Sequence, residues 1–270
     1  MKRFLNSLAL VILIASVTIG VPALAQADVV KEIMMKGEMV VGVQTQGPPI
    51  SFIDKNGKRT GLAVEMLRVL AKDMGVKLVL KEYEWKGLIP ALLSKKVDFL
   101  GADMTPTIKR STRLNFTDPY MFSDVVAFAP EDSPLNNISQ LNSPKVTVAV
   151  IQGSSHVGIV KVRLPKAKMK EYAGGGAAVA TAAMDRRTDV GVNAFSTVRG
   201  YLKSFKKMKV LDGVLKHGPV CWPVRPEDTH LLEMLNNFIR YKKADGSLDA
   251  LLDYWWKTDE WQKHHRDASF

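Results

Sequence analysis

A glycine-serine turn near the middle of the chain has the composition of an anion-binding helix start. Gly153, Ser154, Ser155 and His156 follow an apolar run at 146–151, which we expect to be a strand, and they precede a helical segment. The first main-chain N–H groups of a helix have no intrahelical acceptor, so they can bind a carboxylate. Ordinary capping by Ser154 or Ser155 is compatible with this role. His156 alone is weak evidence, because a lone histidine more often satisfies a local hydrogen bond.

Arg110 offers complementary chemistry from an earlier part of the chain. Its guanidinium is a rigid fork of N–H donors that can pair with both oxygens of a carboxylate, and a cleft that excludes water strengthens the pair. From the residue type alone, an exposed surface arginine is the favoured interpretation. Thr105 precedes it on the same predicted loop and can donate from its hydroxyl or its main-chain N–H.

Carboxylates that could act as general acids are present at Asp103 and Glu65, but no catalytic spacing accompanies them. The sequence contains no His/Cys metal cluster, no Gly-x-Ser-x-Gly turn and no Gly-rich phosphate loop. Gly174, Gly175 and Gly176 precede an Ala-rich segment, but this pattern is too generic to indicate a site. We therefore expect a binding protein rather than an enzyme, with no cofactor and no metal.

The segment 1–27 has the layout of a cleavable secretory signal. Lys2 and Arg3 precede an uncharged apolar run over 8–21, and small residues follow at 23–27. The run is short for a membrane-spanning helix, which favours cleavage over a membrane anchor. No cysteine lies at the cleavage region, so a lipid anchor is not indicated. We expect a periplasmic protein that begins near residue 26 or 28.

The composition is that of a globular protein with a basic balance. Hydrophobic residues make up 46% and charged residues 24%, which argues against disorder. The formal net charge of +11 falls to +9 without the two basic residues of the predicted signal, and this favours anionic partners. The lysines are dispersed and no nucleic-acid motif accompanies them, so we expect no nucleic-acid partner. Cys221, the only cysteine, cannot form an intramolecular disulfide, and its apolar flanks favour an inert buried thiol.

Strand-like and helix-like segments alternate from residue 39 onward, which is typical of α/β architecture with mainly parallel strands. For a first lobe we expect strands at 39–45, 77–83 and 97–104 and helices at 63–74 and 85–93. Gly75 should stop the first of these helices. Pro90 is tolerated in the second helix only if it lies in the first turn.

A second series of segments predicts a second lobe. Its expected strands lie at 146–151, 168–172 and 189–193, with an Ala-rich helix at 177–184. Proline-flanked extended segments at 125–129 and 218–225 indicate two crossovers between the lobes. Two final helices should return to the first lobe. The predicted division is a signal at 1–27, the first part of lobe 1 at 28–122, lobe 2 at 123–221, and the return to lobe 1 at 222–270.

Seven segments in order carry a resemblance that spans essentially the whole mature chain: 39–43, 85–92, 96–98, 104–110, 115–120, 148–155 and 243–248. Together they resemble the family 3 extracellular solute-binding proteins, which include periplasmic receptors for polar amino acids. The resemblance implies a two-lobed clamshell in which each lobe is a mainly parallel sheet flanked by helices, and two crossover strands join the lobes. It also implies a monomer that closes on its ligand and presents the closed form to an ABC-type permease.

The resemblance assigns roles to individual positions. Arg110 matches the family arginine that grips the ligand carboxylate, and in this context we favour the ligand role. Trp85 stands where the family has an aromatic residue that covers the ligand, although its phase in the helix makes core packing nearly as strong an interpretation. His156 stands where the family often has a polar ligand-facing side chain. The other predicted ligand-binding residues are Thr105, Asp103, Ser154, Ser155, Gln44 and Asn193.

Departures from the family pattern leave the ligand open. Ala194 stands where amino-acid receptors usually have an aspartate for the ligand ammonium, and Gln44 stands where receptors for basic amino acids often have an acid. Asp103 replaces a small residue and can supply the missing charge; otherwise the ligand has no ammonium, because burying one without a counter-charge is costly. We expect a small carboxylate ligand, either an amino acid or a related organic acid.

Two other functions stay open. Some members of the family resemble periplasmic dehydratases that act on cyclic carboxylates, so a dehydratase-like enzyme is the first alternative. A freestanding ligand sensor is the second. A membrane-bound sensor is disfavoured, because the sequence shows no second membrane segment before Phe270.

Overall fold

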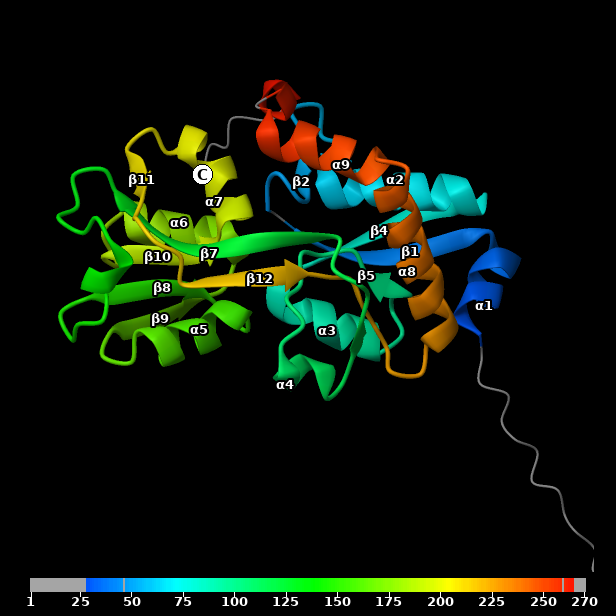
Figure 1. Cartoon of the computed structure of the whole chain (residues 1–270), viewed down its shortest axis with the longest axis horizontal. Coiled ribbons are helices and arrows are strands. Elements are labelled where there is room, and N and C mark those ends of the chain that lie inside the picture. The colour runs from blue at the N-terminus through cyan, green and yellow to red at the C-terminus, as the bar shows by residue number, and fades with distance from the viewer. Residues whose placement is uncertain (1–27, 46, 259, 265–270) are drawn as a thin grey trace, which may run out of the picture.

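The structure is a computed structural model that describes residues 28–45, 47–258 and 260–264. Two groups of strands and helices lie side by side, and two strands, β7 (Met121–Pro130) and β12 (Lys216–Val220), run between them (Figure 1). We refer to the group that contains the N-terminal strands as the first lobe and to the other group as the second lobe.

The export prediction concerns residues 1–27, which lie outside the described part of the chain. Within that part, no helix combines the length and the apolar character needed to cross a membrane. Cys221 is buried, and burial raises the pKa of its thiol to about 12, so it is an inert core thiol.

The first lobe is built on a parallel sheet with the strand order β4-β1-β5. β1 (Glu38–Gln44) pairs along its whole length with β4 (Lys77–Tyr83), and β5 (Phe99–Leu100) adds a short third strand. Parallel neighbours need crossover connections, which include α2 (Leu62–Met74) and α3 (Trp85–Leu93). The carboxyl ends of the three strands therefore meet at one edge of the sheet.

The helix α2 shows how the local sequence determines an element. Its apolar face, which includes Met66, Leu67 and Leu70, is buried against the core. The helix ends at Gly75, whose φ of 68° lies in the left-handed region and whose N–H bonds to the carbonyl of Ala71. The predicted helix and its stop are confirmed.

Two predictions for the first lobe are wrong. The third strand is Phe99–Leu100 instead of 97–104. At its start the Asp98 carboxylate accepts the N–H of Val40 at 2.7 Å, and at the other end Met104 pairs with Cys221 instead of with β1. Pro90 lies inside α3 and not in its first turn. Pro90 is exposed, so the helix accommodates its ring. Because proline has no main-chain N–H, one helical hydrogen bond is not formed.

The second lobe contains a six-stranded sheet with the order β11-β7-β10-β8-β9, in which β12 also pairs with β7. Its remaining strands are β8 (Thr147–Ile151), β9 (Lys168–Tyr172), β10 (Val190–Ala194) and β11 (Met208–Val210). β8 runs parallel to β9 and β10, whereas β7 is antiparallel to β10, β11 and β12. The second sheet is therefore mixed, since β7 enters the lobe and β12 leaves it.

Helices cover both faces of this sheet: α5 (Ser155–Arg163) on one, and α6 (Gly175–Met184) with α7 (Phe195–Ser204) on the other (Figure 1). The side chains of β7 alternate between the two faces. Val125 and Ala127 belong to the cluster that includes α5 residues, and Val126 and Phe128 belong to the cluster that includes α6 and α7 residues. Burial on both faces explains why the central strands β8 and β10 and the second half of β7 are mainly apolar, whereas the edge strand β9 is polar.

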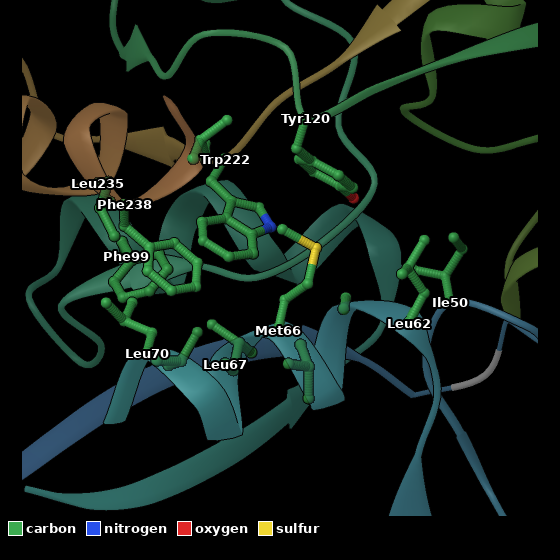
Figure 2. Packing of buried hydrophobic residues seen from close by; sticks show 14 of the residues in the cluster. Ile50, Leu62, Met66, Leu67, Leu70, Phe99, Tyr120, Trp222, Leu235 and Phe238 are labelled. Carbon is green, nitrogen blue, oxygen red and sulfur yellow. The ribbon is translucent and has the colours of Figure 1, made fainter. Parts of the chain in front are cut away.

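The C-terminal helices α8 (Thr229–Ala244) and α9 (Ser247–Leu252) pack into the core of the first lobe. Trp222, which is fully buried, lies at the centre of this core; its ring centroid is 5.6 Å from that of Phe99 and 5.5 Å from that of Tyr120. Figure 2 shows Phe238 of α8 and Met66 of α2 against the same indole. The end of the chain thus stabilises the lobe in which the described chain begins.

Short elements complete the fold. They are α1 (Val29–Lys36), β2 (Phe52–Ile53), β3 (Arg59–Thr60), α4 (Ile108–Ser111), β6 (Asn115–Phe116), β13 (Pro223–Val224), 3-10 helices at Ile138–Gln140 and Glu260–His264, and a π-helix at Asp253–Lys257.

Candidate ligand-binding site

A pocket between the lobes is lined by residues of both lobes and of the crossover strands. The first lobe contributes Gln44, Thr45, Glu84, Trp85, Asp103 and Thr105. The crossover strands contribute Ser123, Val125, Lys216, Gly218 and Val220. The second lobe contributes Ile151, Ser154, Ser155, His156, Gly174, Gly175, Gly176, Asn193, Ala194 and Thr197.

The first-lobe wall follows from the parallel order of its sheet. Gln44 is the last residue of β1, Trp85 begins the helix after β4, and Asp103 lies shortly beyond β5. Because the carboxyl ends of parallel strands meet at one edge, three segments that are far apart in sequence converge there.

The second-lobe wall has the same origin. β8, β9 and β10 are parallel, and each is followed by a helix that begins at the pocket. The N-cap residues of α5, α6 and α7 are Ser154, Gly174 and Ala194, and all three line the pocket. The start of a helix carries unpaired N–H groups and a partial positive charge. The second-lobe wall is therefore a surface of hydrogen-bond donors.

Arg110 lies beside the pocket and bonds to both lobes. Its Nη1 donates to the main-chain oxygen of Thr105 at 2.9 Å, and its Nη2 donates to the main-chain oxygen of Gly153 at 3.4 Å. The guanidinium carbon is 5.8 Å from the centroid of the Trp85 ring. Burial lowers the pKa of Arg110 to about 10, which leaves it charged at neutral pH. These bonds use two of the five N–H donors of the guanidinium.

Buried polar atoms without a hydrogen-bond partner among the described residues converge on the pocket. In the first lobe they are Oε1 of Gln44 and Nε1 of Trp85, and in the second lobe they are Oγ of Ser154, Nδ1 of His156 and Nδ2 of Asn193. Leaving such a group unpaired costs about 1–3 kcal/mol. Ser154 illustrates the pattern: it is the N-cap of α5, yet its side chain makes no capping bond.

Two titratable side chains of the pocket have displaced pKa values. Burial raises the pKa of Asp103 to about 7, against the opposing effects of a hydrogen bond from Gln44 and the charge of Arg110. Burial, together with the charge of Arg110, lowers the pKa of His156 to about 4. At neutral pH the imidazole is therefore neutral, and the Asp103 carboxyl is present in both protonation states.

The structure brings together most of the residues predicted from sequence. Lining the pocket are Gln44, Trp85, Asp103, Thr105, Ser154, Ser155, His156 and Asn193. Arg110 is not itself among the lining residues, although Thr105 and Trp85, which it contacts, are. Trp85 packs against two hydrophobic clusters, as its helical phase predicted, and it also lines the pocket with an N–H group that has no partner among the described residues. Its role in covering a ligand stays a prediction.

Sequence reasoning missed several lining residues. It set aside Gly174, Gly175 and Gly176 as too generic, although they follow a predicted strand and precede a predicted helix just as Gly153 and Ser154 do. Their position between a predicted strand and a predicted helix could have identified these glycines as pocket residues. Lys216 lines the pocket only because β12 pairs with β7, which no local pattern indicates.

A cleft between two α/β lobes joined by two crossover strands is the architecture of the two-lobed periplasmic binding proteins. The chain belongs to the bacterial extracellular solute-binding proteins, family 3, whose family model matches residues 39–258. This confirms the resemblance inferred from the ordered segments and the clamshell fold that it implied.

Individual relatives agree with this membership. The L-cystine-binding protein TcyJ of Escherichia coli K12 is 24% identical over 242 residues, which cover 89% of this chain and 90% of the relative. The crystal structure of the ancestral amino acid-binding protein AncCDT-1, a precursor of cyclohexadienyl dehydratase, has a TM-score of 0.78 at 33% identity and covers 84% of this chain and 99% of its own. A binding component of an ABC transporter from Wolinella succinogenes, complexed with lysine, has a TM-score of 0.77 at 29% identity. The match covers 84% of this chain and 99% of the Wolinella chain.

Proposed function

We propose that this chain is the periplasmic solute-binding component of an ABC importer, which captures a small carboxylate-bearing molecule between its lobes as a monomer and delivers it to the membrane permease. The relatives, whose names describe binding of cystine, lysine and amino acids in general, support a small polar ligand of this size class. Export through the segment 1–27 and its cleavage are part of the proposal.

The observation that carries the proposal is the set of unpartnered buried polar atoms that both lobes direct to one pocket. A polar ligand would give these groups partners, and it could reach Trp85 and Asn193 together only when the lobes are close. Binding energy would then favour the closed arrangement over an open one. A rigid active site would not need donors divided between two lobes in this way.

The carboxylate part of the proposal rests on Arg110 and the start of α5. The two carbonyl bonds of the guanidinium leave three N–H donors for a ligand, and the bond to Gly153 holds the guanidinium close to the residue that follows, Ser154, whose hydroxyl has no partner among the described residues. Thr105 and Ser155 line the same part of the pocket. A carboxylate placed there would receive charge-assisted bonds from both lobes.

We place the hinge in the crossover strands, near the proposed lobe boundaries at 122 and 221. Met121 and Val220 belong to the first-lobe core, whereas Val125 and Leu215 belong to a second-lobe core. Each crossover therefore passes from one core to the other within a few residues, which leaves a short segment to absorb the change in backbone angles.

A thermal-shift screen of the purified protein against amino acids, dicarboxylates and aromatic acids tests the proposal. A ligand that binds only the folded protein raises its melting temperature, by an amount set by RT ln(1 + [L]/Kd). We expect at least one carboxylate-bearing compound to stabilise the protein, and cells that lack the protein to lose uptake of that compound. A screen in which no carboxylate stabilises the protein would contradict the proposal.

A periplasmic dehydratase-like enzyme is the second candidate, and one observation favours it. Asp103 lies in the cleft with a pKa of about 7, which suits a general acid near neutral pH. Incubation with hydroxylated cyclic carboxylates, followed by nuclear magnetic resonance, tests this candidate. Turnover that is lost in Asp103→Asn would establish an enzyme and overturn the pure binding role.

A further inference from the structure

We infer that the second-lobe wall holds a second anion-binding subsite, formed by the starts of α6 and α7 with Asn193, so that the ligand is a small dicarboxylate without an ammonium group. This inference rests on the proposed function, because it assigns the other end of the same ligand. The first carboxylate lies at Arg110 and the start of α5, and the second lies at this subsite.

The helix starts at this wall are left open for a ligand. α6 and α7 have 10 residues each, and neither has a side-chain cap, because their N-cap residues are Gly174 and Ala194. The first-turn N–H groups of α6 and α7 therefore face the pocket without a side-chain acceptor at the N-cap, and the helix dipoles favour negative charge there.

Asn193 supplies an independent observation. The residue is 3% exposed, and its Oδ1 accepts the N–H of Ala194 at 2.8 Å. This bond fixes the amide orientation, so Nδ2 is the group that lacks a partner among the described residues. A Cβ on Gly176 would come within 2.8 Å of this Nδ2 and 2.9 Å of Cγ2 of Thr197. The start of α6 thus lies directly against the unpaired donor, and Gly176 and Asn193 both line the pocket.

The distribution of charge excludes an ammonium from this wall and favours an anion. None of the second-lobe residues that line the pocket is acidic, whereas Lys216 of β12 adds a cation. An ammonium against Ala194 would face N–H groups without a counter-charge. The acidic lining residues, Glu84 and Asp103, both belong to the first lobe. Asp103 can be protonated near neutral pH, so it need not repel a dianion.

Isothermal titration with matched pairs of acids tests the inference on the unmodified protein. The probes are succinate and glutarate, their monocarboxylate counterparts butyrate and valerate, and lysine. We expect a dicarboxylate to bind at least about tenfold more tightly than its counterpart, since a charge-assisted bond contributes about 1.5–3 kcal/mol. Equal affinities within each pair, no binding of either dicarboxylate, or tighter binding of lysine would overturn the inference.

Variants locate the subsite. Asn193→Asp replaces the free donor with a carboxylate, so it should weaken the dicarboxylate at least about tenfold and change butyrate binding less than about twofold. Asn142→Asp adds the same charge at an exposed position of the second lobe and should change neither. If Asn193→Asp does not fold, Ala194→Asp places the charge at the half-buried N-cap of α7. A dicarboxylate affinity unchanged in the folded variant overturns the inference, whereas the proposed function fails only if the broad screen finds no carboxylate ligand.

Discussion

Arg110 of the first lobe donates a hydrogen bond to the main-chain oxygen of Gly153 in the second lobe, with an N–O distance of 3.4 Å. The same guanidinium donates to the main-chain oxygen of Thr105 at 2.9 Å, within its own lobe. One cation therefore touches both sides of the pocket. Because the bond to Gly153 requires the lobes to be close, Arg110 would connect ligand capture to closure in the function that we propose.

Arg110→Ala should lower ligand affinity about 100-fold or more, because it removes the charged fork that we propose as the partner of the ligand carboxylate. Arg110→Lys should recover only part of this loss, since lysine keeps the charge but not the fork. Loss of the two carbonyl bonds should cost the fold only about 1–3 kcal/mol. Titration calorimetry and urea unfolding measure the two effects.

Arg113→Ala is the matched control, because Arg113 lies three residues further along the chain and is exposed. It should bind the ligand as the unmodified protein does. An Arg110→Ala variant with unchanged affinity would show that the guanidinium serves only to join Thr105 and Gly153.

Ala194→Asp should shift selectivity toward amino acids. The substitution places a carboxylate at the N-cap of α7, where it can pair with a ligand ammonium and also cap the helix. We expect affinity for amino acids to rise about tenfold or more relative to the corresponding acids without an amino group. The check is a thermal-shift comparison of each amino acid with its deaminated analogue, and an unaltered order of ligands would rule out this account of selectivity.

Asp103→Asn should change how stability depends on pH in the ligand-free protein. Burial raises the pKa of Asp103 to about 7 from 3.8, so between these values the folded state holds a proton that the unfolded chain has released. Stability from this group is therefore lost as pH rises through the window. Relative to the unmodified protein, Asp103→Asn should gain about 2–3 kcal/mol between about pH 5 and about pH 8.

Urea unfolding of both proteins at the two pH values measures this gain. The lowered pKa of His156 acts in the opposite direction, but it is present in both proteins and cancels in the difference. Parallel pH profiles for the two proteins would show that the carboxyl of Asp103 titrates as an exposed group.

Trp222→Ala should destabilise the protein by about 3–5 kcal/mol, because it opens a large cavity between Phe99, Tyr120 and Phe238. Phe122→Ala is the comparison, since Phe122 is 55% exposed and should cost less than about 1 kcal/mol. The midpoints of urea denaturation give both values. Similar losses would mean that the indole does not organise the first-lobe core.

Much of the fold could be predicted from local patterns. The strands Lys77–Tyr83 and Lys168–Tyr172 and the stop of α2 at Gly75 depend on propensity, periodicity and a left-handed glycine, all of which are local properties. The expected strand 97–104 ends early because Met104 pairs with Cys221, a residue from a distant part of the chain. A backbone pair between residues so far apart in sequence has no signature in a sequence window.

The sequence predicted the site residues at strand ends, but it did not predict where Arg110 lies relative to the pocket. Gln44, Asp103, Ser154 and Asn193 lie at or just after predicted strands, and parallel pairing brings such positions to one edge of a sheet. The position of Arg110 beside the pocket, and not in its lining, depends on carbonyl groups that only the folded chain places within reach.

The sequence by itself determined the family, the alternation of strands and helices, and the residue types available for binding a carboxylate, because these depend on order and composition. Tertiary structure alone decided that three uncapped helices begin at one wall, that Nδ2 of Asn193 has no partner there, and that Asp103 holds its proton to about pH 7. Whether a polar group has a hydrogen-bond partner, and how far a carboxyl group is removed from water, depend on which distant segments are in contact. Only the folded chain specifies those contacts.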